Sequence, residues 1–79
     1  MSDIKLQIDI RVIPPKDRYP TVYSAFQGIS NNEKIELIND HDLRPLLEYK
    51  FSADFPNQYA WQYIEQGPDV WRVIVEKRQ

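Results

Sequence analysis

Asn39, Asp40, His41 and Asp42 place an amide, two carboxylates and the chain's one imidazole in four consecutive residues, directly after the apolar run 34–38. Such a cluster can bind a proton or a small ligand, because neighbouring carboxylates favour the imidazolium form of His41. The alternative interpretation is structural: Asp42 can cap a helix, while Asn39 and Asp40 hold a turn through side-chain to backbone hydrogen bonds. The sequence leaves both interpretations open.

Two arginines stand near this cluster in the predicted fold. Arg18 and Arg44 could hold a carboxylate or a phosphate at the N-termini of helices, and the alternative is that they form surface ion pairs with Asp17, Asp40 or Asp42. A single imidazole among carboxylates suits few metals, so we expect neither a metal nor another cofactor. The predicted site for a small anionic ligand or a protein partner comprises Arg18, Asn39, Asp40, His41, Asp42 and Arg44.

The elements that must position these residues follow from periodicity and turn residues. Residues 4–12 alternate between apolar and polar, which predicts a strand. A helix is expected from about Pro20, with Gly28 as a C-terminal cap that tolerates positive φ. A strand over 34–39, a helix over about 43–53 that Asp42 caps, and a hairpin over 58–65 and 70–77 complete the chain.

This β-α-β-α-β-β order predicts an α+β fold in a single domain over residues 1–79. The expected architecture is a two-layer sandwich, a four-stranded mixed sheet with both helices on one face. Loops at the carboxyl ends of its parallel strands would meet at one edge, where α/β proteins often bind ligands. The expected core is Ile4, Leu6, Ile8, Ile10, Val22, Phe26, Leu37, Leu47, Ile64, Trp71 and Val73.

The hairpin decides which aromatic side chains remain on the open face of the sheet. If its loop has an even number of residues, alternation places one set of side chains on that face as contacts for a partner. This set comprises Trp61, Tyr63, Glu65 and Arg72, while Ile64 and Trp71 face the core. Aromatic residues on a sheet can stack nucleobases, but without surrounding cations the affinity for nucleic acid is missing.

Composition excludes several classes of function. A formal net charge of −2 gives no electrostatic basis for binding nucleic acid or an anionic membrane. The chain has no cysteine, which removes disulfides and thiol catalysis, and it shows no motif for a hydroxyl nucleophile, so we do not expect an enzyme. No window approaches the roughly 18 apolar residues of a membrane span, and a cytoplasmic location is expected.

Three segments, 9–20 (DIRVIPPKDRYP), 36–42 (ELINDHD) and 61–73 (WQYIEQGPDVWRV), resemble a bacterial family known as domain of unknown function 2249. The resemblance covers nearly the whole chain and implies a fold similar to the TusA/SirA-like sulfur-relay proteins. That family has a His and a Pro where this chain has Tyr19 and Leu43, and without cysteine the sulfur chemistry does not carry over. The expected function is a non-catalytic binding or regulatory module. The alternative is an accessory subunit or domain of a redox or sulfur-relay system that acts through a partner's cysteine or metal.

Overall fold

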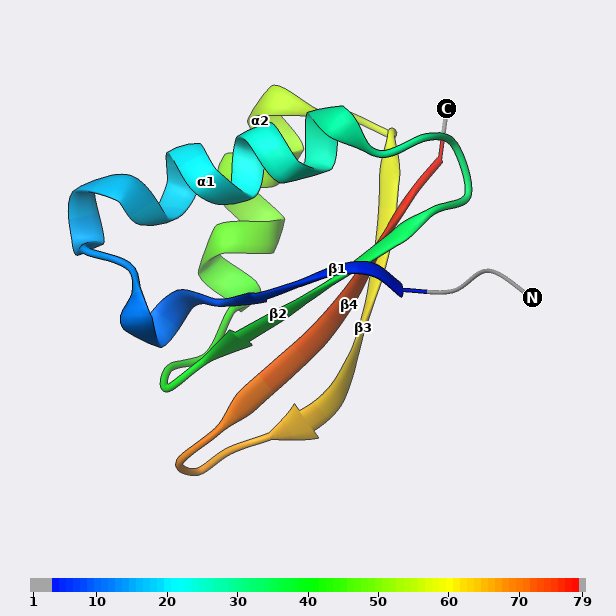
Figure 1. The fold of residues 1–79 in the computed structure, drawn as a ribbon. Coiled ribbons are helices and arrows are strands. Elements are labelled where there is room, and N and C mark those ends of the chain that lie inside the picture. The colour runs from blue at the N-terminus through cyan, green and yellow to red at the C-terminus, as the bar shows by residue number, and fades with distance from the viewer. Residues whose placement is uncertain (1–3, 79) are drawn as a thin grey trace.

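The computed structural model describes residues 4–78 and has the predicted two-layer arrangement (Figure 1). Four strands form one sheet in the order β1-β2-β4-β3, in which β1 and β2 are parallel and β4 is antiparallel to both of its neighbours. Both helices cover one face. The elements are β1 (Ile4–Asp9), the 3-10 turn η1 (Ile10–Val12), α1 (Pro15–Gly28), β2 (Lys34–Asn39), the π-helical η2 (Leu46–Lys50), α2 (Phe51–Asp54), β3 (Tyr59–Gln66) and β4 (Trp71–Lys77).

Strand β1 ends three residues earlier than predicted. The Asp9 carboxylate accepts the Arg11 backbone N–H at 3.1 Å and caps η1, so the chain leaves the sheet at Ile10. Val12 is therefore 77% exposed and was wrongly placed in the strand. The predicted core positions Ile8 and Ile10 are buried.

Two other residues of β1 were also assigned to the core wrongly. Ile4 and Leu6 are 45% and 46% exposed. The reason is that β1 is an edge strand, so no neighbouring strand covers its outer flank. Alternation correctly separates the two faces of a strand, but it does not report whether a position is covered.

Helix α1 begins at Pro15, five residues before the predicted start at Pro20. Pro15 stands in the first turn, where a backbone N–H has no intrahelical partner, and the Asp17 N–H donates to the Pro14 carbonyl at 2.8 Å. Pro20 lies inside the helix and leaves the Lys16 carbonyl without its usual intrahelical donor. The predicted start at Pro20 is therefore wrong, because the helix tolerates this proline internally.

The C-terminal end of α1 is where the sequence predicts it, but the cap differs. Gly28 is the last helical residue and does not have a positive φ. The cap is instead the ammonium group of Lys77, a buried residue of β4, which donates to backbone carbonyls at the end of the helix. The role predicted for Gly28 was therefore wrong.

The second helical segment confirms the sequence prediction closely. Helical turns run from residue 44 through η2 to the end of α2 at Asp54. Leu43, Leu47 and Phe51 are buried on its inner side. None of the helices in residues 4–78 is long and apolar enough to cross a membrane.

The hairpin contains a bulge that reverses the predicted faces of Trp61 and Tyr63. Gln66 pairs with Trp71, so the loop between them has four residues and the expected even count holds. Between Tyr63 and Glu65, however, the register shifts, and Tyr63 pairs with Val73 on the helix side. Trp61 and Tyr63 accordingly pack against the core, and their predicted place on the open face was wrong.

The same bulge moves Ile64, which was assigned to the core, to a position where it is 49% exposed. Trp71 keeps the helix side but stays partly exposed, with its ring 5.6 Å from that of Tyr63. The centre of the core is a cluster of three phenylalanines, in which Phe26 lies 5.0 Å from Phe51 and 4.7 Å from Phe55 between ring centroids. The buried hydrophobic residues are Ile8, Ile10, Val22, Phe26, Ile29, Ile35, Leu37, Leu43, Leu47, Phe51, Phe55, Val73 and Val75.

Candidate functional site

A groove of about 370 Å³ opens at the sheet edge where β1 and β2 end, between the start of α1 and the second helical segment. We call it the edge groove. Its walls are mainly aliphatic and aromatic, with a few polar side chains among them. Its lining residues are Ile10, Pro15, Arg18, Tyr19, Val22, Asn39, Asp42, Leu43, Pro45, Leu46 and Lys50.

Arg18 is the half-buried cation of the edge groove. Its Nε donates to the Ile13 carbonyl oxygen at 2.8 Å, which fixes the plane of the guanidinium group. The ion pairs found among residues 4–78 do not include Arg18, so the surface ion pair that the sequence left open for it is not formed. Among residues 4–78, no carboxylate therefore lies within ion-pair distance of the terminal amino groups of Arg18, although Asp42 lines the same groove.

Lys50 is a second cation of the edge groove, and sequence reasoning missed it as a site residue. Its Nζ lies 5.1 Å from the centre of the Tyr19 ring, within the range of a cation–π contact. The Tyr19 hydroxyl donates to the Asp54 carboxylate, and burial, followed by this bond, raises the pKa of Tyr19. Leu46 and Lys50 are four residues apart and face the groove together, a spacing that could have identified Lys50 from the sequence.

Asp42 caps the second helical segment, as predicted. Its Oδ1 accepts the Arg44 backbone N–H at 3.0 Å and also the hydroxyl of Tyr63. The Tyr63 hydroxyl in turn accepts the Leu43 N–H at 2.9 Å, so one phenol links two residues of the cap. The bond from Tyr63 is the main cause that lowers the pKa of Asp42, and burial is the main cause that raises the pKa of Tyr63.

Tyr63 is the residue of this site that the sequence placed elsewhere, because the bulge was not predicted. Arg44 belongs to the same cluster. Its Nε lies 3.4 Å from the Asp42 carboxylate and its Cζ lies 5.5 Å from the centre of the Tyr63 ring. Arg44 is therefore held by Asp42 and Tyr63, and it does not line the edge groove.

The four residues 39–42 divide between two environments. Asn39 and Asp42 line the edge groove, whereas Asp40 and His41 do not. The His41 side chain is 77% exposed and its Nδ1 lies 2.5 Å from the Asp40 carboxylate. Asn39 is half-buried, and its Oδ1 is sealed from solvent without a hydrogen-bond partner among residues 4–78. Within the same residues no group of three or more His, Asp or Glu side chains could hold a metal ion.

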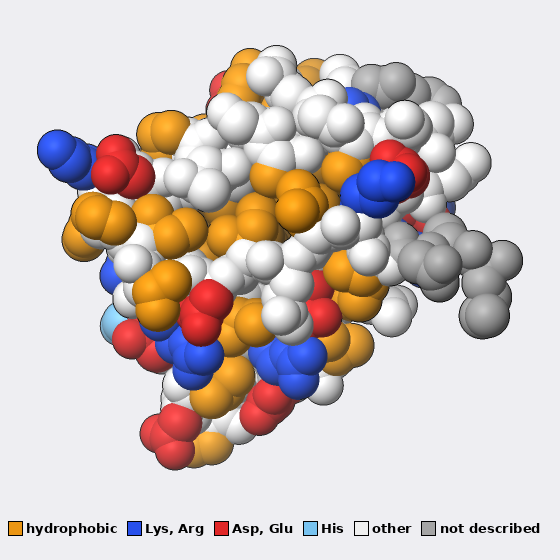
Figure 2. Space-filling model, viewed as in Figure 1, with side chains coloured by type: hydrophobic (Ala, Val, Ile, Leu, Met, Phe, Trp, Pro, Cys, Tyr) orange, Lys and Arg blue, Asp and Glu red, His pale blue; other side chains and the backbone are white. Residues whose placement is uncertain are grey.

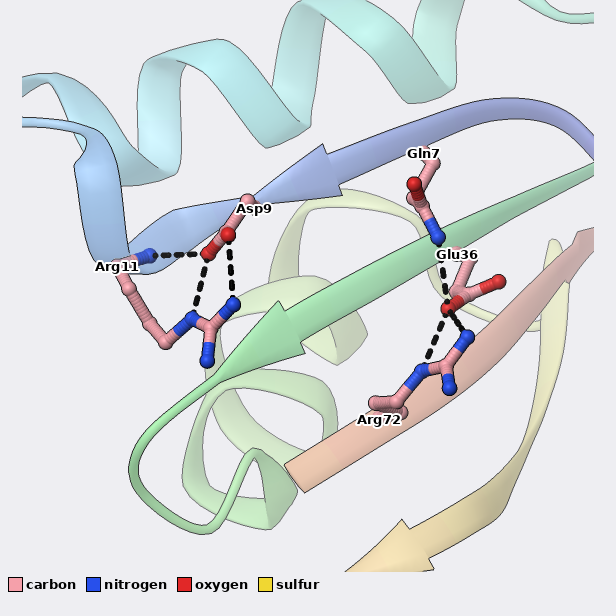
Figure 3. A network of polar contacts seen from close by, with 5 residues as sticks. All are labelled: Gln7, Asp9, Arg11, Glu36 and Arg72. Carbon is pink, nitrogen blue, oxygen red and sulfur yellow. Dashed lines mark hydrogen bonds and ion pairs between the residues drawn. The ribbon is translucent and has the colours of Figure 1, made fainter. Parts of the chain in front are cut away.

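The open face of the sheet carries a separate polar network (Figure 3). The Glu36 carboxylate, only 6% exposed, accepts from Arg72 at 2.5 and 2.8 Å and from the Gln7 amide at 3.2 Å. Glu65 lies 4.0 Å from Arg72, which places both residues on this face as predicted.

Asp9 and Arg11 form a second pair beside this network (Figure 3), with two side-chain hydrogen bonds of 2.8 Å. Figure 2 shows acidic and basic side chains next to one another on this side of the molecule rather than a patch of one sign. The charges of the open face therefore largely neutralise each other. Arg18 and Lys50 in the edge groove differ from these charges, because neither forms an ion pair within residues 4–78.

The structure thus defines a class: a small α+β domain whose parallel strands end at an apolar groove with two cationic side chains. Residues 7–77 match the model of a family described as an uncharacterised conserved protein, DUF2249, and the chain belongs to this family. No curated protein and no solved structure gives a significant match to the chain.

Proposed function

We propose that this chain is a non-catalytic binding or regulatory module and that the edge groove is its binding site for a small anionic ligand. The observation that carries the proposal is the combination of apolar walls with Arg18 and Lys50, neither of which is ion-paired among residues 4–78. Small-molecule sites are typically apolar concavities with a few polar groups that orient the ligand. An anion in the groove would give the half-buried guanidinium of Arg18 an ion-pair partner, which offsets the partial loss of its hydration.

The test is an amide NMR titration of the ¹⁵N-labelled domain with hexanoate, benzoate and inorganic phosphate. We expect at least one anion to produce saturable shifts at the groove residues Val22, Leu43 and Leu46. Arg18→Gln should abolish the shifts, whereas Lys16→Gln should not, because Lys16 is an exposed cation of the same helix outside the groove. Shifts confined to other parts of the domain, or equal shifts in both variants, would contradict the proposal.

A second candidate function is an accessory role in a redox or sulfur-relay system. This candidate rests on the resemblance to TusA/SirA-like proteins, which stays a prediction. The exposure of His41 favours this candidate, since its imidazole is accessible to a partner and lies at the same sheet edge as the groove. Affinity capture with the wild-type domain and with His41→Gln tests it. Partners that carry iron or a reactive thiol, and that are lost with His41→Gln, would favour the second candidate over the first.

A further inference from the structure

The chemistry of the anion can be narrowed from the backbone donors at the edge groove. Phosphate sites commonly use free backbone N–H groups at the start of a helix. At the start of α1, Pro14 and Pro15 carry no N–H group, and the Asp17 N–H already donates to the Pro14 carbonyl at 2.8 Å. Lys16 keeps an N–H group in this turn, but Lys16 does not line the edge groove, so the first turn of α1 offers the groove few donors for a phosphate.

The start of the second helical segment is similarly occupied. The Leu43 N–H donates to the Tyr63 hydroxyl at 2.9 Å, the Arg44 N–H donates to Asp42 at 3.0 Å, and Pro45 has no N–H group. Three successive positions are thus either bonded or without a donor. Leu46, which lines the groove, still carries an N–H group, so the positive charge that faces a ligand comes mainly from the side chains of Arg18 and Lys50.

The side chains suit a carboxylate. With Nε bonded to Ile13, Arg18 retains two terminal amino groups, and a guanidinium fork matches the two oxygens of a carboxylate. Lys50 adds a mobile point charge to the same groove. The Asp42 carboxylate also lines the groove, and it repels a dianion more strongly than a monoanion.

The remaining walls suit a hydrocarbon body. Ile10, Val22, Leu43 and Leu46 line the groove together with the ring of Tyr19. The volume of about 370 Å³ is near the lower end of the roughly 300–1,000 Å³ range of small-molecule sites. We infer, on the basis of the proposed function, that the ligand is a small hydrophobic monocarboxylic acid, aliphatic or aromatic, rather than a phosphate ester.

Four probes separate the contributions of chain length, charge and head group to the affinity. They are butyrate, hexanoate, hexanamide and hexyl phosphate, each titrated against the intact ¹⁵N-labelled domain. Burial of each added methylene group should tighten binding about fourfold, so hexanoate should bind roughly tenfold or more tightly than butyrate. Hexanamide lacks the charge and should bind roughly ten- to a hundredfold more weakly than hexanoate. Hexyl phosphate has the same chain and should also bind more weakly than hexanoate.

Two variants connect these affinities to the site. Lys50→Gln changes an exposed residue and should weaken hexanoate several-fold without altering the fold, while Arg18→Gln should weaken it at least about tenfold. Lys16→Gln should leave it unchanged. These effects apply to hexanoate and should be small for hexanamide, because the amide has no charge for the cations to recognise.

Each outcome bears on a different claim. If hexyl phosphate binds in the groove as tightly as hexanoate or more tightly, the carboxylate inference is overturned while the anion-binding function stands. If hexanamide binds as tightly as hexanoate, both the inference and the anionic character of the proposed ligand fail. If no probe shifts the amides of Val22, Leu43 and Leu46, both claims are refuted.

Discussion

Lys77 offers a direct test of how this domain holds its helix against its sheet. Its Nζ donates to the backbone carbonyls of Phe26, Gln27 and Ile29 at 3.2, 3.2 and 3.0 Å, and the residue is only 7% exposed. The last carbonyls of a helix lack intrahelical donors. All three protons of the ammonium group are thus used at the end of α1, and Lys77→Met removes them without removing much volume.

The expected loss of stability follows from these contacts. A hydrogen bond to a charged group contributes about 1.5–3 kcal/mol, and a cation near a helix C-terminus contributes about 0.3–2 kcal/mol. The energies of the three hydrogen bonds do not add, because the bonds share one ammonium group. The methionine variant also avoids the cost of desolvating a buried charge, which offsets part of the loss. We therefore expect Lys77→Met to destabilise the domain by about 2–4 kcal/mol. For 79 residues a typical total stability is about 4–12 kcal/mol, so the change should be obvious.

Urea unfolding followed by circular dichroism measures this change, and amide hydrogen exchange locates it. The matched control is Lys16→Met, which removes an exposed cation from the same helix and should change stability by less than about 0.5 kcal/mol. Faster exchange should begin at the C-terminal turn of α1. A loss below about 1 kcal/mol for Lys77→Met, or a loss equal to that of the control, would refute the capping role.

Three further predictions follow from the core and the site. Phe26→Ala should cost about 3–5 kcal/mol in urea unfolding, because the ring is fully buried, and a loss below about 1 kcal/mol would mean that its packing is misassigned. Tyr63→Phe removes the acceptor of the Leu43 N–H and should reduce the free energy of unfolding by about 1–3 kcal/mol. The same substitution should raise the pKa of Asp42 toward its usual value, which carboxyl NMR can measure. An unchanged pKa would contradict the hydrogen bond from Tyr63 to Asp42. Ionised Asp42 contributes stability above its unfolded pKa of about 3.9 that is lost as pH falls, so Tyr63→Phe should unfold with a weaker acid dependence. Folding raises the pKa of Tyr19, so the protonated phenol contributes fully to the stability of the fold below about pH 10, and this contribution is lost at higher pH. The stability of Tyr19→Phe should therefore fall less steeply between about pH 9 and pH 12 than that of the wild type. Identical dependence of stability on pH in the two proteins would contradict this role of Tyr19.

Periodicity predicted the parts of the fold in which neighbouring residues decide the structure. The strand over 34–39 was predicted with the bounds that β2 has, and the predicted core residue Leu47 is buried on the inner side of the second helical segment. In both cases the buried apolar residues repeat with the period of the element, at Ile35 and Leu37 in the strand and at Leu43, Leu47 and Phe51 in the helical segment. In these two elements the local pattern of apolar residues agrees with their burial in the structure, so the sequence was sufficient to predict them.

Periodicity failed where distant parts of the chain decide the structure. The bulge between Tyr63 and Glu65 shifts the register of β3 by one residue, and a shift of one exchanges the two faces of the strand for Trp61 and Tyr63. Lys77 is a charged residue at an inward position of β4, and its acceptors lie 48 to 51 residues away in the sequence. Neither feature has a local signal, since each depends on an element that packs against the strand.

The division of residues 39–42 shows which of the predicted site residues the fold brings to the edge groove. Convergence of strand ends predicted that these residues lie at one sheet edge, but the direction of each side chain depends on the element that carries it. Asn39 is the last residue of β2, and the inward alternation of Ile35 and Leu37 continues to it, which places it on the helix side at the groove.

Beyond Asn39 the strand ends and alternation no longer applies. Asp42 faces the groove because its carboxylate caps the second helical segment. Asp40 and His41 instead pair with each other in the turn between β2 and that segment. The same reasoning selects Lys50 over Arg44 on that segment, because Lys50 repeats the position of Leu46 one turn later, while Arg44 is held by Asp42 and Tyr63. Consecutive residues therefore predicted the sheet edge at which they lie, and the period of each flanking element determines which of them line the edge groove.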